Sequence, residues 1–214
     1  MSKKTLNFEG FSAVSDQIDT RPAQIVLASA SRYRKAQLAQ LGLEFSCDTA
    51  DIDESRLPAE LPEAMALRLS KAKAEAVAGN QHEPALIIGS DQTASCKGQV
   101  LGKPGSEERA VAQLLLCSGS TVIFHSGLCV LDTVSHKFAT QCTRTKVRFR
   151  QISEQQVRTY IKKEQPLDCA GSFKCEGLGI CLFESISSDD PSALVGLPLI
   201  ALCNLLSHFN YSIL

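Results

Sequence analysis

Short apolar runs alternate with stretches of helical spacing along this chain, and that alternation limits the folds it can adopt more than any other feature. The runs that predict strands occupy residues 25–28, 85–89, 121–131 and 137–150. Helical spacing and capping residues predict helices at 33–41, 62–78 and 107–117, from 154 onward, and at 198–209. The two middle strands are consecutive, whereas the others are separated by helices. The sequence therefore predicts an α/β fold around a mixed, twisted sheet.

Composition and charge bound the kind of partner. The chain has 214 residues, of which 44% are hydrophobic and 21% charged, typical of one large globular domain or two small lobes. A net charge of −1 gives no general attraction to nucleic acid or to an anionic membrane, so we expect neither partner. No apolar stretch reaches the roughly 20 residues that a membrane-spanning helix needs. An anionic small molecule would therefore need a local cluster of basic groups.

The N-terminal segment and the cysteines bear on organisation and compartment. Residues 1–21 are polar and without periodicity, which predicts an arm outside the core, followed by one domain at 22–214. The segment lacks the apolar core of a signal peptide, so the nine cysteines fit a reducing, cytoplasmic environment. Cys169, Cys175 and Cys181 lack paired ligand spacing, which favours buried thiols over a structural zinc.

A loop of small residues, Ser29-Ala30-Ser31, leads from the first expected strand into a helix that begins with basic residues. Free amides at a helix N-terminus bind anions, the two serine hydroxyls add donors, and Arg34 supplies a bidentate guanidinium. The alternative is that Ser31 only caps the helix while the basic side chains are solvated.

Carboxylates at two places could serve a metal-dependent reaction. Asp91 is expected where the buried strand at 85–89 ends, and acids at strand ends in α/β sheets often border the ligand crevice. Asp51, Asp53 and Glu54 lie in a loop ahead of the second helix. Such oxygen ligands suit Mg²⁺ or Mn²⁺ bridging to substrate phosphates, although solvated loop acids are the simpler interpretation of Asp51 and Asp53.

Two lysines complete the set of candidates: Lys73 on the second helix and Lys103 in the rigid turn Gly102-Lys103-Pro104. Each taken singly is most simply a surface charge. The chain contains neither the P-loop pattern nor the G-x-G-x-x-G pattern, which excludes the commonest nucleotide-binding motifs.

Several ordered blocks together resemble the Maf family of nucleoside triphosphate pyrophosphatases over about residues 24–209. The blocks are Ser29-Ala30-Ser31, Arg34, Glu54, Lys73, Gly89-Ser90-Asp91-Gln92, Gly102-Lys103-Pro104, residues 170–177 and residues 194–199. The resemblance implies an elongated, two-lobed body with flanking helices and a central cleft, similar to the inosine triphosphatase superfamily. It also implies hydrolysis of a nucleoside triphosphate to the monophosphate and diphosphate with a divalent metal, and often a homodimer.

The resemblance assigns roles to individual positions. Asp91 falls on the family's proton acceptor, and Arg34, Glu54, Lys73 and Lys103 fall on positions that handle the triphosphate and metal. Which carboxylate is base and which is metal ligand stays open, because the two look identical in sequence. This chain has Arg32 where the family usually has proline, and the effect of that exchange also stays open.

Three positions separate branches of the family, and here they carry Tyr33, Gln92 and Glu176. The set resembles the tryptophan, glutamine and glutamate of the 7-methyl-GTP branch more than the arginine, threonine and glutamine of the pyrimidine branch. An aromatic face attracts the cationic methylated base by roughly 0.5 to 2 kcal/mol, and a carboxylate accepts from guanine N1 and N2. A dTTP/UTP or broad-specificity housecleaning pyrophosphatase, and a non-catalytic 7-methylguanine-binding module, are the alternatives.

Overall fold

The computed structural model describes residues 24–214, so the arm predicted at 1–21 lies outside the described residues. Within them, seven strands form one sheet in the order β2-β1-β3-β5-β6-β7, with the short β4 paired to β3. The strands are β1 (Gln24–Ala28), β2 (Phe45–Asp48), β3 (Ala85–Cys96), β4 (Gln99–Leu101), β5 (Thr121–Asp132), β6 (Phe138–Phe149) and β7 (Phe183–Ser188). β1 pairs in parallel with β2 and β3, whereas the pairs β3–β4, β3–β5, β5–β6 and β6–β7 are antiparallel. The predicted mixed sheet is confirmed.

Five α-helices and three 3₁₀ turns complete the described chain. The helices are α1 (Arg32–Ala39), α2 (Pro62–Ala78), α3 (Glu107–Cys117), α4 (Glu154–Glu164) and α5 (Leu199–His208), and the turns are Ala170–Ser172, Leu178–Leu182 and Ala193–Val195. None of the helices between residues 24 and 214 is both long and apolar enough to cross a membrane.

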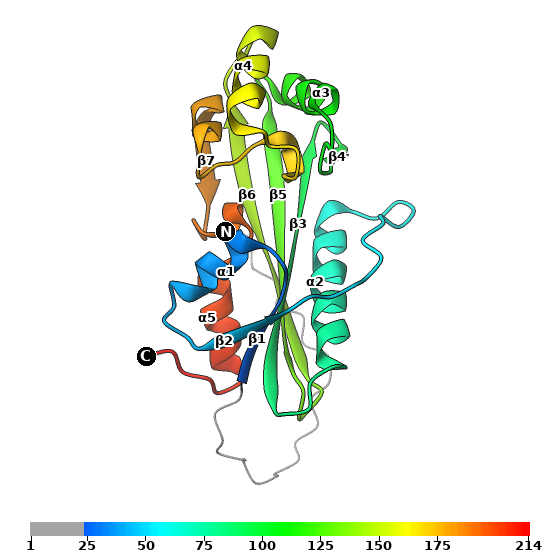
Figure 1. The fold of residues 1–214 in the computed structure, drawn as a ribbon, viewed down its shortest axis with the longest axis vertical. Coiled ribbons are helices and arrows are strands. Elements are labelled where there is room, and N and C mark those ends of the chain that lie inside the picture. Colours follow the sequence, from blue (N-terminus) through cyan, green and yellow to red (C-terminus); the bar gives the residue numbers. More distant parts are fainter. Residues whose placement is uncertain (1–23) are drawn as a thin grey trace, which may run out of the picture.

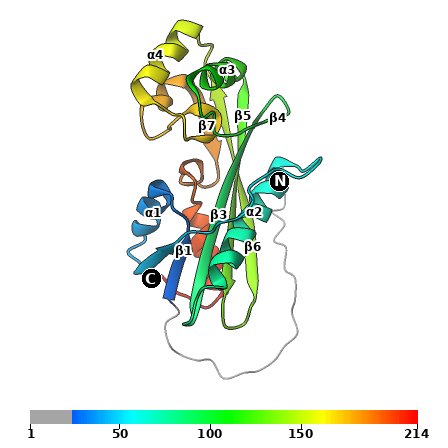
Figure 2. The same cartoon turned by 45° about the vertical axis from the view of Figure 1, so that its right-hand side comes forward.

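The body is elongated and has two lobes. Figure 1 shows β3, β5 and β6 running through its whole length, with α3, α4 and β7 at one end and α1, α2 and α5 at the other. The turned view in Figure 2 shows the same division of the helices between the two ends of the body. The elongated, two-lobed α/β architecture implied by the family resemblance is therefore present.

Alternation along the strands explains why helices cover both faces of the sheet in the lobe that contains α1, α2 and α5. Val26, Ile87 and Cys129 pack on one face with Ala74 and Val77 of α2. The next residues along the strands, Leu27, Ile88 and Val130, pack on the other face with Leu202 and Leu205 of α5. Successive strand side chains point to opposite faces, so a continuous apolar run buries both.

Two glycines allow α2 to lie directly on the sheet. A Cβ at Gly89 would lie 2.1 Å from the carbonyl oxygen of Ser70, and one at Gly127 would lie 2.3 Å from that of Ala66. Any larger residue would push the helix away from β3 and β5. Since Gly127 is the register partner of Asp91, this close approach also sets the distance from α2 to that carboxylate.

The structure corrects two expectations about element ends. The strand predicted at 85–89 continues to Cys96 because β5 pairs along its whole length, so Asp91 lies inside a strand and not at its end. Pro198 has an extended backbone with ψ of 99° and caps α5, whose first helical residue is Leu199. The short strands β2 and β7 were not predicted.

Candidate active site

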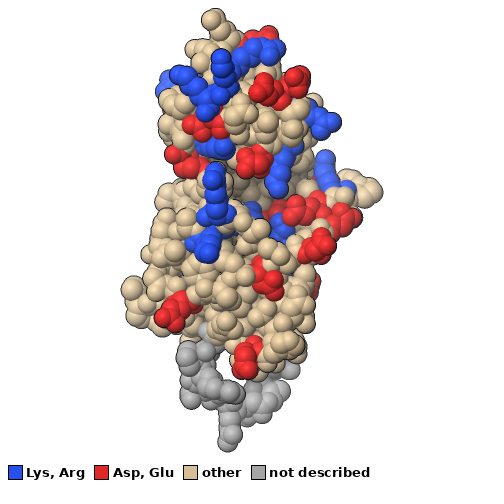
Figure 3. Space-filling view, viewed as in Figure 1, with Lys and Arg blue, Asp and Glu red and all other residues tan. Residues whose placement is uncertain are grey.

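A cavity of about 750 Å³ opens between the two lobes. It is lined by the β1–α1 loop, one face of α2, the middle of β3, the β4–α3 loop and residues 168–176. Figure 3 shows basic and acidic side chains gathered where the lobes meet. All ten predicted site residues line this cavity: Ser29, Ser31, Tyr33, Arg34, Glu54, Lys73, Asp91, Gln92, Lys103 and Glu176. Asp51 and Asp53 are exposed and do not line it, in agreement with the simpler interpretation of those two acids.

The centre of the cavity holds a lysine between two carboxylates. Lys73 Nζ lies 2.6 Å from Asp91 Oδ1 and 2.6 Å from Glu54 Oε1. Lys73 and Asp91 are each 8% exposed, so their contact pairs two opposite charges that are both largely removed from water. The hydrogen bond from Lys73 lowers the pKa of Glu54 below its ordinary value, and burial opposes that shift. Lys73 on α2 thus contacts both Asp91 of β3 and Glu54 of the loop before α2, which brings the two acids close together.

The same pair of carboxylates is a donor set of the kind that a divalent cation uses. Each oxygen lies 2.6 Å from one nitrogen, so the two oxygens are at most twice that distance apart. No group of three or more His, Cys, Asp or Glu side chains suited to a metal occurs among residues 24–214. Mg²⁺ commonly uses one or two carboxylates and completes its shell with water and phosphate oxygens, which matches this donor set.

The β1–α1 loop is built as the sequence predicted. Ser31 caps α1 by accepting from the backbone of Arg34 at 3.4 Å, and Ser29 Oγ accepts from the backbone of Ser31 at 3.1 Å. Arg34 Nε donates to the carbonyl of Gly196 at 3.1 Å, which anchors the guanidinium at the cavity wall. Burial lowers the pKa of Arg34, and the charges of Asp91 and Glu54 oppose that shift. Capping and cavity lining occur together, so the two interpretations of Ser31 do not exclude each other.

The side chains of Tyr33 and Gln92 are already engaged within the protein. Arg32 Nη2 donates to the Tyr33 hydroxyl at 2.8 Å, and the Arg32 guanidinium lies 4.8 Å from the ring centroid. Gln92 Nε2 donates to Ser126 Oγ and to the carbonyl of Ala193, both at 2.9 Å. Since its amide hydrogens are used there, the side-chain oxygen is the polar atom of Gln92 that remains for a ligand.

Glu176 is an exposed carboxylate on a firmly held segment. Lys174 N donates to the hydroxyl of Tyr160 at 3.0 Å, and Phe173 packs edge-on against Phe124 at 5.3 Å. Cys175 Sγ donates to Glu176 Oε2 at 3.1 Å. Burial raises the pKa of Cys175 to about 12, so this thiol stays protonated at neutral pH and is no nucleophile.

The apolar part of the cavity wall was missed by sequence reasoning. It includes residues of α2, of β5, of the 3₁₀ turn Ala193–Val195 and of one loop: Met65, Leu69, Phe124, Leu194 and Phe173. Apolar residues in a helix or strand all read as core, and only the tertiary arrangement decides which of them border an opening. No signal in one sequence could have separated them from their neighbours.

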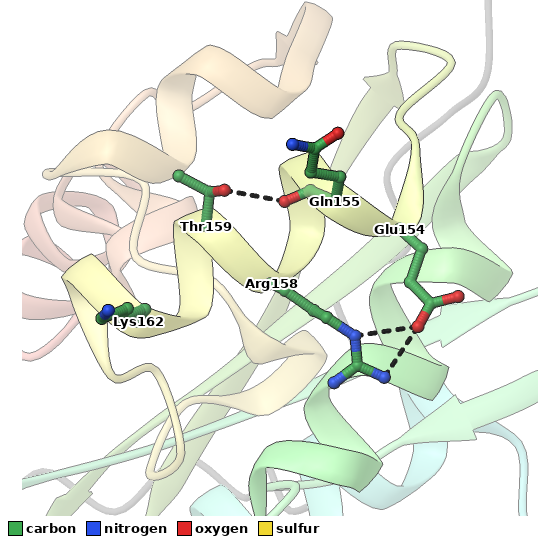
Figure 4. A pocket seen from close by; sticks show the side chains of 5 residues that line it. All are labelled: Glu154, Gln155, Arg158, Thr159 and Lys162. Carbon is green, nitrogen blue, oxygen red and sulfur yellow. Dashed lines mark hydrogen bonds and ion pairs between the residues drawn. The ribbon is translucent and has the colours of Figure 1, made fainter.

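A second hollow, of about 430 Å³, lies open on the outside of α4. Figure 4 shows that its five lining side chains all come from that one helix. Arg158 is paired with Glu154 at 2.7 Å, and Thr159 Oγ1 donates to the backbone of Gln155. The feature is a solvated helix surface and not a second site.

Fold and cavity together define a two-lobed α/β protein whose central cavity is lined by basic side chains and by a pair of carboxylates. A family model described as Maf-like protein matches residues 24–209, and the chain belongs to this family. It is 55% identical over 186 residues to a 7-methyl-GTP pyrophosphatase of Saccharophagus degradans, covering 87% of this chain and 94% of that relative. It is 49% identical over 193 residues to a 7-methyl-GTP pyrophosphatase of Nitrosococcus oceani, covering 90% and 96%.

Among solved structures, the chain is similar to a nucleoside-triphosphatase described as a dITP/XTP pyrophosphatase from Mycobacterium abscessus. That similarity has a TM-score of 0.39 at 14% identity and covers 60% of this chain and 75% of the other.

Proposed function

We propose that this protein is a nucleoside triphosphate pyrophosphatase that hydrolyses 7-methyl-GTP to 7-methyl-GMP and diphosphate, and so removes modified nucleotides from the cytoplasmic pool. The observation that carries the proposal is the placement of Lys73 between Asp91 and Glu54, in the cavity that also presents Tyr33 and Glu176. The names of the relatives reported above support the same substrate.

In the proposed reaction Asp91 accepts a proton from the attacking water. The water oxygen bonds to the α-phosphorus while the bond from that phosphorus to the α–β bridging oxygen breaks, and diphosphate leaves. Asp91 Oδ1 accepts from Lys73, so Oδ2 is the oxygen that we assign as the proton acceptor.

The leaving diphosphate must be stabilised by positive charge. Arg34, Lys73 and Lys103 line the cavity and supply it, and the serine hydroxyls and backbone amides at the start of α1 add donors. Asp91 and Glu54 would hold Mg²⁺ or Mn²⁺, which when bound neutralises phosphate charge and polarises the phosphoryl oxygens.

At the other end of the cavity the proposal assigns base recognition to Glu176, Gln92 and Tyr33. The carboxylate of Glu176 accepts from guanine N1 and N2, and the Gln92 oxygen is a further acceptor. Arg32 covers one face of the Tyr33 ring, so a cationic base stacks on the other face.

One observation favours a second candidate, a broad-specificity or dTTP/UTP-hydrolysing enzyme. The guanidinium of Arg32 rests on the aromatic side chain proposed to attract a cationic base, and two like charges on one ring oppose each other. A non-catalytic 7-methylguanine-binding module has no use for the buried contact of Lys73 with Asp91.

A panel of triphosphates assayed for diphosphate release with Mg²⁺ or Mn²⁺ tests the proposal. We expect the highest kcat/KM for 7-methyl-GTP, with GTP, UTP and dTTP well below it. Similar values across the panel would favour the broad-specificity alternative, and absence of diphosphate with every substrate would overturn the enzymatic assignment. Light scattering on the same preparation tests the homodimer that the family resemblance implies.

A further inference from the structure

One side chain, that of Gln113 on α3, contacts both of the loops that carry site residues in the lobe containing α3 and α4. Its Nε2 donates to the carbonyl of Gly102 at 3.2 Å, next to Lys103. Its Oε1 accepts from the hydroxyl of Ser172 at 2.5 Å, in the segment that leads to Glu176. Because a carbonyl only accepts, the Gly102 contact fixes which end of the amide faces which loop.

The Ser172 contact lies at a conformationally demanding point. Ser172 is fully buried and has φ of 64°, a left-handed backbone that favours glycine, and Gly171 before it has φ of 78°. Its backbone N–H donates to the carbonyl of Cys169 at 3.1 Å. The next residue, Phe173, is locked into the aromatic cluster of the core. The bond to Gln113 therefore acts where the segment bearing Glu176 leaves the core.

The Gly102 contact lies one residue before Lys103, which is exposed at the cavity. A backbone bond from Gly105 to the carbonyl of Leu167, at 3.1 Å, joins the same two loops on the other side of Lys103. The Lys103 turn is thus hydrogen-bonded to α3 on one side and to the segment that continues to Glu176 on the other.

We propose that Gln113 is a positioning residue that sets the Lys103 turn and the Glu176 segment relative to each other. This inference rests on the proposed function, in which Lys103 contacts the phosphates and Glu176 contacts the base of the same nucleotide. One planar amide bonded to both loops keeps the two contacts at the spacing of one substrate molecule.

Three variants of the full chain separate the two bonds. Gln113→Met keeps the length of the side chain and loses both bonds. Ser172→Ala keeps the Cβ and loses only the bond to the segment of Glu176. The double variant combines them. Gln155→Ala, on the exposed surface of α4, is the matched control because it also removes one glutamine amide from this lobe.

The inhibition constants of two competitive inhibitors measure binding at the two ends of the cavity separately. Inorganic diphosphate tests the Lys103 end, and 7-methylguanosine tests the base end. At fixed Mg²⁺ we expect Gln113→Met to weaken both inhibitors by about threefold to tenfold, the range for a lost hydrogen bond. Ser172→Ala should weaken only the nucleoside. Adding Gln113→Met to Ser172→Ala should then weaken only diphosphate further, because the base-end bond is already absent.

A purely structural role would lower the melting temperature of Ser172→Ala while leaving the ratio of its two inhibition constants at the wild-type value, and that result would overturn the inference. Unchanged constants in Gln113→Met would also overturn it. The wild-type panel separates this failure from failure of the proposed function. If the wild type prefers another nucleotide, the proposed substrate is wrong, and the nucleoside of the preferred substrate replaces 7-methylguanosine in the same comparison.

Discussion

The two walls of the cavity are built in different ways. The first, here called the helical wall, carries Arg34 on α1, Lys73 on α2 and Asp91 on β3, all in regular elements. The second, here called the loop wall, carries Lys103 in the β4–α3 loop and Glu176 between two 3₁₀ turns. The helical wall is fixed by backbone packing as close as that of α2 over Gly89 and Gly127, whereas the two loops of the loop wall are held by side-chain bonds from Gln113 and Tyr160 and by one backbone bond between them. Substitutions should therefore change turnover at the first wall and the choice of base at the second.

The largest effect is expected for Asp91→Asn in the helical wall. Asparagine is nearly the same size and can still accept from Lys73, but it cannot take a proton from water. We expect kcat to fall by at least about a hundredfold for every substrate, the usual contribution of a positioned general base. Steady-state assays together with circular dichroism measure turnover and folding, and Asp51→Asn, outside the cavity, serves as the control. Turnover within roughly tenfold of wild type would contradict the assignment of Asp91.

The contrast between the walls also explains what one sequence could predict. The strand, loop and helix around Arg34 and the helix of Lys73 follow from apolar spacing and capping residues, and the structure confirms them. The extension of β3 past Asp91 depends on pairing with β5, which a local pattern does not contain. The segment around Glu176 was found only through the family resemblance, because its 3₁₀ turns and positive-φ residues are held by distant partners such as Gln113 and Tyr160. Local signals thus predict the helical wall better than the loop wall.

A more selective effect is expected for Glu176→Gln in the loop wall. The amide removes a negative charge beside a cationic base and places a donor against a guanine N–H. The value of kcat/KM for 7-methyl-GTP should fall by about 1.5 to 3 kcal/mol, roughly tenfold or more, while that for UTP should fall less or rise. Glu184→Gln is the control, because that exposed carboxylate contacts Arg148 and does not line the cavity. Equal changes for the two nucleotides would mean that Glu176 does not read the base.

The smallest effect is expected for a change that acts on Glu54. This acid lies in the loop before α2 and borders the helical wall. Arg68 on α2 holds this loop, since its Nε and Nη2 lie 2.6 and 2.8 Å from the two carboxylate oxygens of Glu60. Its Nη2 also donates to the carbonyl of Ser55, next to Glu54, at 3.0 Å. Arg68 lowers the pKa of Glu60 to about 2, so the pair stays ionised at any pH suited to assay.

Arg68→Lys replaces a planar, bidentate donor with a single ammonium, which cannot maintain all three contacts at once. Glu54 should then be less well placed, and the Mg²⁺ concentration for half-maximal activity should rise by about threefold to tenfold. At saturating Mg²⁺ kcat should stay close to the wild-type value, because Asp91 and Lys73 do not move with the loop. Titrations of activity against Mg²⁺ measure both quantities, with Arg56→Lys as the control because Arg56 bonds only the carbonyl of Glu60. If kcat falls at saturating Mg²⁺ while the metal requirement is unchanged, the loop of Glu54 belongs with the helical wall, and a group on a loop is then as tightly coupled to turnover as one on a helix.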